Sequence, residues 1–287
     1  MMRKKPMLAY PVSTKPINYE DKVFMQPKLD GVRCVIQYEK HINKSENRVV
    51  AYSRTGKEWK NIYHIIQELK PFFAKHPNVI LDGELYNHDL KNDFEQIISL
   101  VRRQKPDDID MLESREMVQF HCYDIIDETI TFEDRYKFVF DNLRDSFCVR
   151  TVETIDIFSE NQALRDHKIN LSNGYEGSIV RTNDVYKCGR SWSLRKFKDF
   201  HDAEAYIVGY EAGQGKREGT LGKFLMQDED GNKFGCPPGK GHSYKDMKDM
   251  LDNIHEYMGQ TATFTYFERT KAGSYRHPLF KCIRNYE

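Results

Sequence analysis

The segment Gln26-Pro27-Lys28-Leu29-Asp30-Gly31-Val32-Arg33 places a lysine in a short loop between two expected strands, Lys22 to Gln26 and Val32 to Tyr38. Gly31 gives this loop the backbone freedom that a tight approach requires. A lysine amine is protonated and inert in water, but burial or nearby cations such as Arg33 can lower its pKa and expose a lone pair. Such an amine can attack an activated phosphate and hold it as a phosphoramidate. Taken alone, a Lys-x-Asp-Gly tetrapeptide is more often an ordinary surface turn.

Five further short segments follow this lysine along the chain. They are Ser53-Arg54-Thr55-Gly56, Leu81-Asp82-Gly83-Glu84-Leu85, Phe120-His121-Cys122-Tyr123-Asp124, Glu176-Gly177-Ser178-Ile179-Val180-Arg181 and Lys196-Phe197-Lys198. Together the six segments supply one amine nucleophile, several carboxylates, an aromatic face and a set of cations. This combination suits phosphorus chemistry on a nucleotide.

The composition is that of an ordinary globular protein. The chain has 287 residues, of which 39% are hydrophobic and 31% are charged, and this length is typical of two domains. No apolar run approaches the roughly 20 residues that a membrane helix needs. The stretch from Met1 to Ala9 lacks an apolar core of signal-peptide length. We therefore expect an intracellular (cytoplasmic) protein with no membrane partner.

Cysteine spacing and net charge further limit the kinds of metal site and partner that the protein can have. None of the six cysteines forms a Cys-x-x-Cys pair, so we expect reduced thiols and no zinc site. The formal net charge is zero, so a nucleic-acid partner requires cations gathered on one face. Two local clusters fit this requirement, Arg190 to Lys198 and Lys271 to Arg284, although a solvated surface would also explain each of them.

Apolar spacing up to residue 200 predicts helices and strands without strict alternation, which favours an α+β fold over a doubly wound sheet. The expected helices are Ile62 to Leu69 (ended or bent by Pro71), Phe94 to Val101 and Phe132 to Phe147, and the further strands are Val79 to Leu81, Val118 to Ile126, Tyr175 to Arg181 and Ser193 to Phe200.

From about residue 201 the pattern changes to short strands with a single helix. The strands are Glu204 to Tyr210, Leu221 to Gln227, Asn232 to Cys236, Thr261 to Phe267 and Leu279 to Ile283, and the helix is Tyr244 to Tyr257. Three strands, a helix and two strands is the order of a small five-stranded OB barrel. The pattern thus divides the chain into residues 1–200 and 201–287.

Three acidic side chains, Asp82, Glu84 and Glu176, lie at predicted strand ends. Their hard oxygen atoms suit Mg²⁺, which binds through few protein carboxylates, and they also suit hydrogen bonds from ribose hydroxyls. Ordinary turns at Asp82-Gly83 and Glu176-Gly177 are the alternative.

Lys196 and Lys198 alternate along a strand, so both project to one face. A polyphosphate between them would relieve their mutual repulsion, while an exposed edge strand is the other explanation. Tyr123 suits stacking on a nucleobase, although an aromatic residue in an apolar strand is more often part of the core. Gly213 to Arg217 does not complete a Walker loop, so bound ATP would not be held in the P-loop manner.

In their order, the six segments resemble the covalent nucleotidyltransferase superfamily, and most closely the compact ATP-dependent DNA ligases of viruses and bacteriophages. The resemblance covers nearly the whole chain. It implies an α+β nucleotidyltransferase domain of the ATP-grasp-like DNA ligase type in residues 1–200, followed by a DNA-binding OB-fold β-barrel in residues 201–287. It also implies ATP as co-substrate, Mg²⁺, nicked duplex DNA as partner, and a monomer.

The resemblance assigns roles by motif position. Lys28 resembles the lysine that takes AMP from ATP, and Asp30 resembles the aspartate that assists later steps at the nick. Arg33 and Arg54 resemble the arginines that hold the nick phosphate, and Arg190 resembles a third. Arg33 also counts among the expected nucleotide-binding residues.

The remaining expected roles concern the nucleotide. Glu84 resembles the residue that contacts the ribose, and Glu176 resembles the metal-associated acid, so both are expected Mg²⁺ ligands. Tyr123 stands where these ligases commonly stack Phe on adenine, and its added hydroxyl needs a partner. Lys196 and Lys198 resemble the pair that contacts the AMP phosphate and aids its transfer.

One departure and three rivals remain. Many relatives carry a basic Asp-Lys motif near the end of the OB domain; here that dipeptide is absent, and Arg284 is the candidate for part of it. An RNA ligase and an mRNA capping guanylyltransferase are the nearest alternatives, although Glu176-Gly177 looks more like a ligase than a capping enzyme. A nucleic-acid-binding module with a decayed catalytic domain is the third.

Overall fold

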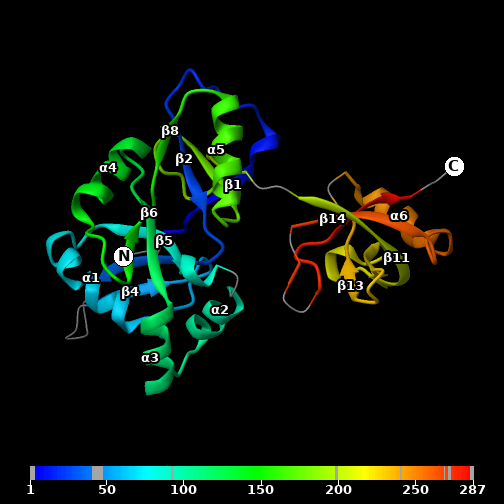
Figure 1. Ribbon diagram of the computed structural model, residues 1–287, viewed down its shortest axis with the longest axis horizontal. Coiled ribbons are helices and arrows are strands. Elements are labelled where there is room, and N and C mark those ends of the chain that lie inside the picture. Colours follow the sequence, from blue (N-terminus) through cyan, green and yellow to red (C-terminus); the bar gives the residue numbers. More distant parts are fainter. Residues whose placement is uncertain are drawn as a thin grey trace. The chain divides into compact units, whose positions relative to one another are not determined.

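The computed structural model describes residues 4–40, 48–91, 94–197, 200–239, 241–267, 269–270 and 273–284. The chain forms two compact units, Met1–Lys198 and Asp199–Glu287. Figure 1 colours both units along the sequence. In the described residues no helix is both long enough and apolar enough to cross a membrane.

The first unit contains two five-stranded sheets. The first sheet has the order β1-β10-β9-β2-β8, from Met7–Pro11, Gly189–Phe197, Gly177–Thr182, Val23–Lys28 and Ile155–Ile157. The second has the order β4-β3-β5-β6-β7, from Arg48–Tyr52, Val32–Glu39, Ile80–Tyr86, Gln119–Ile125 and Val149–Thr151. Neighbouring strands are antiparallel except for β1 with β10 and β6 with β7, which are parallel.

Helices pack on these sheets and on one another. They are α1 (Tyr63–Lys75), α2 (Phe94–Arg102), α3 (Asp108–Met117), α4 (Phe132–Asn142) and α5 (Glu160–Ser172). Helix α5 packs on β2, β8 and β9, whereas α1, α2 and α4 pack on strands of the second sheet (Figure 1). Helix α1 buries its apolar face, which includes Ile65, Leu69 and Phe73, in the largest core cluster together with side chains of the second sheet.

A smaller core cluster joins the two sheets of this unit. It contains Met7 and Leu194 from the first sheet, Val35 and Ile80 from the second, and Tyr186. The two sheets therefore pack on each other through these apolar side chains.

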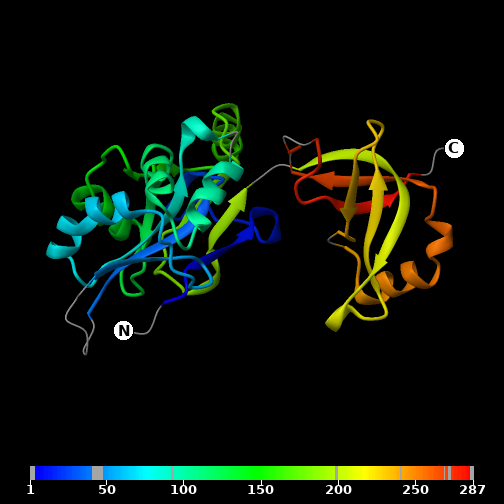
Figure 2. The same ribbon diagram turned by 90° about the horizontal axis from the view of Figure 1, so that it is seen from below.

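The second unit is a five-stranded sheet with the order β13-β12-β11-β14-β15. Its strands are β11 (His201–Ala212), β12 (Leu221–Gln227), β13 (Lys233–Cys236), β14 (Thr261–Tyr266) and β15 (Leu279–Ile283), with α6 (Tyr244–Asp252) between β13 and β14. Figure 2 shows the long, curved β11 in this unit. The two ends of the sheet meet where Phe280 N–H donates to Pro237 O at 2.9 Å and Gly239 N–H donates to Phe280 O at 3.0 Å.

The α+β class and the order of elements in the second unit are confirmed. Of the two effects expected of Pro71, an end or a bend of its helix, the end is excluded, and the expected end of the third helix was wrong. Pro71 lies inside α1, which continues to Lys75 because the buried Phe72 and Phe73 beyond it outweigh one lost backbone hydrogen bond. The third expected helix ends at Asn142, since the buried Leu143 turns the chain toward the core. All six cysteines are free, as expected.

Candidate active site

Lys28 is the last residue of β2, and pairing with β9 places it beside Glu176. Lys28 lies opposite Gly177 in this ladder, and Glu176 N–H donates to Lys28 O at 3.0 Å. The Lys28 ammonium then donates to the Glu176 carboxylate. The Lys28 side chain is 21% exposed and that of Glu176 is 6% exposed, so the amine lies at an opening with its acidic partner behind it.

The loop Leu29-Asp30-Gly31 that follows Lys28, called the Lys28 loop below, lies directly on β5, and Gly31 makes this approach possible. A Cβ atom at Gly31 would be 2.4 Å from Leu85 O and 2.6 Å from Glu84 Cγ. The position therefore needs glycine for space, and the close approach brings the loop against the strand that carries Glu84.

Glu84 on β5 and Tyr123 on β6 form a half-buried pair. Tyr123 Oη donates to Glu84 Oε2 at 3.2 Å, which gives the tyrosine hydroxyl the partner that it needs. Burial raises the pKa of Glu84 from 4.5 to about 7, although Arg33, Lys28 and this hydrogen bond oppose the shift. Burial also raises the pKa of Tyr123 well above its usual value, so the hydroxyl stays a donor.

Arg33 is held by a bidentate ion pair with the buried Asp82. Arg33 Nε lies 2.6 Å from Asp82 Oδ1, and a terminal nitrogen lies 2.5 Å from Oδ2. Tyr186 Oη donates to the same carboxylate at 2.7 Å. Burial opposes the charge of Arg33, but the Asp82 carboxylate outweighs it and raises the pKa of the guanidinium further. Arg33 also lies 5.1 Å from the centre of the Tyr123 ring.

These groups line a cavity of about 220 Å³ between the two sheets. Lys28, Arg33, Glu84, Tyr123 and Lys196 all line it, as does the exposed Arg54. The cavity thus combines an amine, a carboxylate, an aromatic ring and cations.

The comparisons with known proteins agree with this set. The ATP dependent DNA ligase domain family matches residues 6–198, and the DNA ligase OB-like domain family matches residues 212–284. The DNA ligase of African swine fever virus (isolate Pig/Kenya/KEN-50/1950) is 31% identical over 226 residues, which are 75% of this chain and 51% of that protein.

This chain belongs to the ATP-dependent DNA ligase family. It spans about half the length of the viral relatives that it matches. DNA ligase 1 of Saccharomyces cerevisiae is 27% identical over 305 residues, which cover 91% of this chain and 38% of the yeast protein.

Solved structures show the same fold. One comes from a structure–function study of Lig E DNA ligases, with a TM-score of 0.75, 24% identity and coverage of 99% of this chain and 100% of that one. The ligase of bacteriophage T7 in complex with ATP has a TM-score of 0.53 at 19% identity, with 98% of each chain covered.

Not every residue expected from the ligase motifs lines the cavity. Arg190 is exposed on β10, where it donates to Ala9 O at 2.7 Å and lies 5.4 Å from the centre of the Tyr10 ring. Asp30 lies in the Lys28 loop and is not among the described residues that line the cavity. Lys198 falls outside the described residues.

Arg54 is presented by a tight turn that the ligase motif builds from its own side chains. The Ser53 hydroxyl accepts the backbone N–H groups of Gly56 and Lys57 at 3.1 and 2.9 Å, and Gly56 has a φ of 98°. The serine and glycine of this motif therefore fix the turn that exposes the arginine.

Two polar residues that line the Lys28 cavity, Gln26 and Arg181, were not predicted as site residues from the sequence. Arg181 donates to Gln26 Oε1 at 2.7 Å and to the fully buried Asp124 at 2.7 Å. Asp124 is also held by Arg135, from α4, at 2.7 Å. The signal that could have found Arg181 is a charged residue at the end of the otherwise apolar run Ile179-Val180.

Glu84 and Glu176 fit a role in holding Mg²⁺. Both present hard carboxylate oxygens next to the Lys28 loop. In the described ranges, no group of three or more His, Cys, Asp or Glu side chains is arranged to hold a metal ion. Glu84 lines the cavity, whereas Glu176 contacts Lys28 without lining it. Because Mg²⁺ usually takes one or two carboxylates together with substrate phosphates and water, carboxylates at these places suit an ion that binds with the nucleotide.

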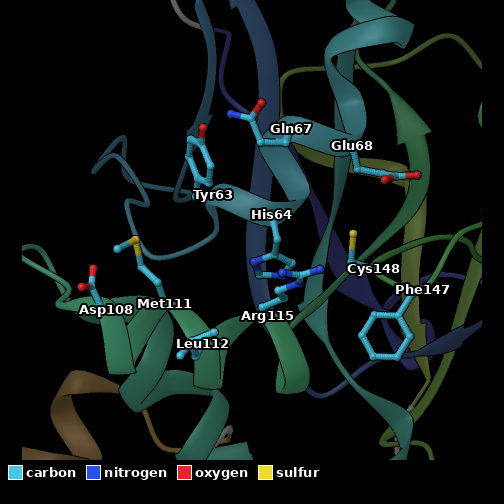
Figure 3. Close-up of a pocket in the computed structure, with 10 residues that line it drawn as sticks. All are labelled: Tyr63, His64, Gln67, Glu68, Asp108, Met111, Leu112, Arg115, Phe147 and Cys148. Atoms are coloured by element: carbon cyan, nitrogen blue, oxygen red, sulfur yellow. The ribbon is translucent and has the colours of Figure 1, made fainter.

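A larger cavity of about 730 Å³ lies elsewhere in the first unit, between α1, α3 and the segment before β7. Figure 3 shows His64, Arg115 and Phe147 among its lining residues. It shares no lining residue with the Lys28 cavity, so the two cavities are separate sites.

Proposed function

We propose that this protein is an ATP-dependent DNA ligase that seals 3′-hydroxyl/5′-phosphate nicks in duplex DNA through a lysyl-AMP intermediate. The observation that carries the proposal is the contact between Lys28 and Glu176 at a cavity that also presents Tyr123, Glu84 and Lys196. An amine with an adjacent carboxylate, an aromatic ring and a cation suits capture of a nucleotide phosphate.

In the first step, Lys28 Nζ attacks the α-phosphorus of ATP. A P–N bond forms, the bond from the α-phosphorus to the bridging oxygen breaks, and pyrophosphate leaves. The ammonium must lose a proton before it attacks, and the Glu176 carboxylate beside it is the nearest acceptor. Tyr123 stacks on the adenine, while Glu84 accepts a hydrogen bond from the ribose.

In the second step, the AMP moves from Lys28 to the 5′-phosphate of the nick, which restores the free amine. In the third, the 3′-hydroxyl attacks that phosphate, the strand is joined and AMP is released. Arg33, Arg54 and Arg190 hold the nick phosphate, Asp30 assists at the nick, and Lys196 with Lys198 contacts the transferred phosphate. These cations stabilise charge that develops at phosphorus.

Glu84 and Glu176 would hold Mg²⁺ together with the nucleotide phosphates. The ion, when bound, supplies positive charge that offsets the charge of the polyphosphate. Arg54 is exposed and lines the cavity, so we assign it a contact with the nick phosphate.

The proposed partner is nicked duplex DNA, contacted largely through its backbone and independently of sequence. A single chain carries both family domains, so the proposed active form is a monomer. Its substrates, ATP and nicked DNA, are found inside cells, and the curated relatives include viral enzymes, so we place the reaction inside a cell.

The test is incubation with α-labelled ATP and Mg²⁺, followed by denaturing electrophoresis. We expect the wild type to retain the label and Lys28→Ala to lose it. Lys22→Ala is the matched control, because Lys22 precedes the same strand but its side chain is 61% exposed and pairs with Glu133. Mass spectrometry that finds the AMP on a residue other than Lys28 would overturn the assignment.

The rival enzymes of the superfamily are separated by substrate. Labelling by ATP but not GTP argues against a capping guanylyltransferase, and sealing of nicked DNA duplex but not RNA ends argues against an RNA ligase. No covalent label with any nucleotide would favour the binding-module alternative.

A further inference from the structure

Strand β10 carries an irregularity beside the Lys28 cavity. Along the parallel pair of β1 and β10, Ala9 lies opposite Ser191, but the next residue, Tyr10, lies opposite Arg195. Three residues of β10, from Trp192 to Leu194, therefore bulge out opposite a single peptide of β1. Bulges of this kind re-aim side chains and are frequent next to active sites.

Specific hydrogen bonds fix the shape of this bulge. Ser193 N–H donates to the Ser191 hydroxyl at 3.1 Å, and Arg195 Nε donates to Trp192 O at 2.6 Å. Arg195 also donates to Lys15 O, and it is only 4% exposed. A buried guanidinium thus holds the backbone of Trp192 and leaves its side chain to project outward.

The projecting indole stacks on Tyr10. The two ring centres are 3.8 Å apart and the planes differ by 9°. Arg190 lies 5.4 Å from the Tyr10 centre, and Arg195 lies 5.4 Å from the Trp192 centre. Trp192 nevertheless remains 40% exposed, so the result is a rigid aromatic wall with cations at both ends.

This wall lies at the edge of the sheet, because β1 is its edge strand, and on the face opposite to the one that lines the Lys28 cavity. Ala9, Leu194 and Lys196 line that cavity, and they are the chain neighbours of Tyr10 and Arg195. In the same ladder Pro11 lies opposite Lys196. A ligand that extends from the cavity around the edge strand β1 would therefore meet the wall next.

We propose that the Tyr10–Trp192 wall contacts the sugar–phosphate backbone of the DNA strand next to the nick. This inference rests on the proposed function, which puts a nick phosphate at the cavity. The exposed part of the indole packs on the deoxyribose next to the nick phosphate that Arg190 holds. Flat aromatic surfaces flanked by cations suit nucleic-acid strands without regard to sequence.

The first test compares Trp192→Ala with Phe158→Ala. Phe158 is a matched control because it is 75% exposed and follows β8, at the opposite edge of the same sheet. We expect Trp192→Ala to weaken binding of a fluorescent nicked duplex by about tenfold, a typical loss for one aromatic contact to a nucleic-acid strand. Phe158→Ala should bind like the wild type. Lysyl-AMP formation, which involves no DNA, is measured on each variant as the check of an intact cavity.

The second test uses the protein's own fluorescence. The chain has two tryptophans, and the other, Trp59, is only 7% exposed. The signal of Trp192 is therefore the difference between the wild type and Trp192→Phe, a variant that keeps a ring for stacking. We expect nicked DNA to protect this signal from quenching by acrylamide.

The outcomes separate the two proposals. Normal lysyl-AMP formation with unchanged DNA affinity in Trp192→Ala and no protection from acrylamide overturns the DNA-contacting wall alone. A wild type that forms no lysyl-AMP instead refutes the proposed function. Weakened DNA binding and protection of Trp192, with lysyl-AMP formation retained, support the wall.

Discussion

Glu84 is a carboxylate that burial holds partly protonated near neutral pH, even though Tyr123 donates to it and two cations lie close. Its pKa is raised from 4.5 to about 7, with burial as the largest cause. The hydrogen bond that Glu84 is proposed to accept from the ribose is therefore sensitive to pH. By contrast, Arg33 and Asp82 form a bidentate pair that supports the cavity wall.

The raised pKa of Glu84 makes the free energy of unfolding depend on pH. The folded protein holds a proton on Glu84 that the unfolded chain releases, so this contribution to stability is complete below about pH 4.5 and is lost as the pH rises through about 7. The free energy of unfolding of the wild type should fall relative to Glu84→Gln between pH 5 and pH 8, by at most about 3 kcal/mol. Urea unfolding across this range measures the difference.

Urea unfolding of Tyr123→Phe across the same pH range tests the role of the tyrosine hydroxyl. This hydroxyl lowers the pKa of Glu84, so its removal should move the same transition to higher pH. If the wild type and Glu84→Gln show parallel profiles from pH 5 to pH 8, burial does not control the charge of Glu84.

At the scale of the element, the cavity depends on strand register. Lys28 and Glu176 are 148 residues apart in sequence, and they meet because β2 pairs with β9 at Lys28 and Gly177. The motifs predict which side chains are needed, and apolar spacing predicts most of the strands that carry them. Register and the buried support from Asp124 and Arg135 depend on tertiary pairing, which a local pattern does not contain.

Helix α3 is one of several elements that were not predicted from the sequence, and its pattern shows why. It buries the polar residues Asp110 and Ser114, while Ile109 is 67% exposed and Leu112 is 59% exposed. Asn61 explains the inversion, because its backbone carbonyl accepts the Ser114 hydroxyl and its side chain donates to Asp110 O at 3.1 Å. A search for an apolar face therefore finds the wrong side of this helix.

The close packing of the Lys28 loop on β5 depends on Gly31. Gly31→Ala would place a methyl group 2.4 Å from Leu85 O, so the loop must move away from the strand. A displacement of about 1 Å at a reacting group can cost on the order of 100-fold in rate, and we expect a loss of that size in lysyl-AMP formation.

Gly259→Ala is the control for this substitution. Nothing lies within 4 Å of a Cβ atom at Gly259, and its φ of +76° makes the change locally strained without touching the first unit. Its rate of lysyl-AMP formation should equal that of the wild type. A Gly31→Ala variant that reacts at the wild-type rate would mean that the loop does not need this close packing.

At the scale of the whole molecule, the two units have separate hydrophobic cores. Within the described residues, the four clusters of the first unit draw only on residues before Lys198, and the single cluster of the second unit draws only on residues after Asp199. Each unit thus buries its own apolar surface, which is the physical condition for independent folding.

We predict that fragments 1–198 and 199–287 each unfold cooperatively when they are produced alone. Differential scanning calorimetry of each fragment should reproduce the corresponding transition of the full chain. An equimolar mixture of the fragments at micromolar concentration should nevertheless seal nicks at least about 100-fold more slowly than the intact chain. The covalent connection gives the two units an effective concentration in the millimolar range, and separation removes it. If fragment 1–198 shows no cooperative transition, its four clusters do not suffice for folding and the second unit contributes to its stability.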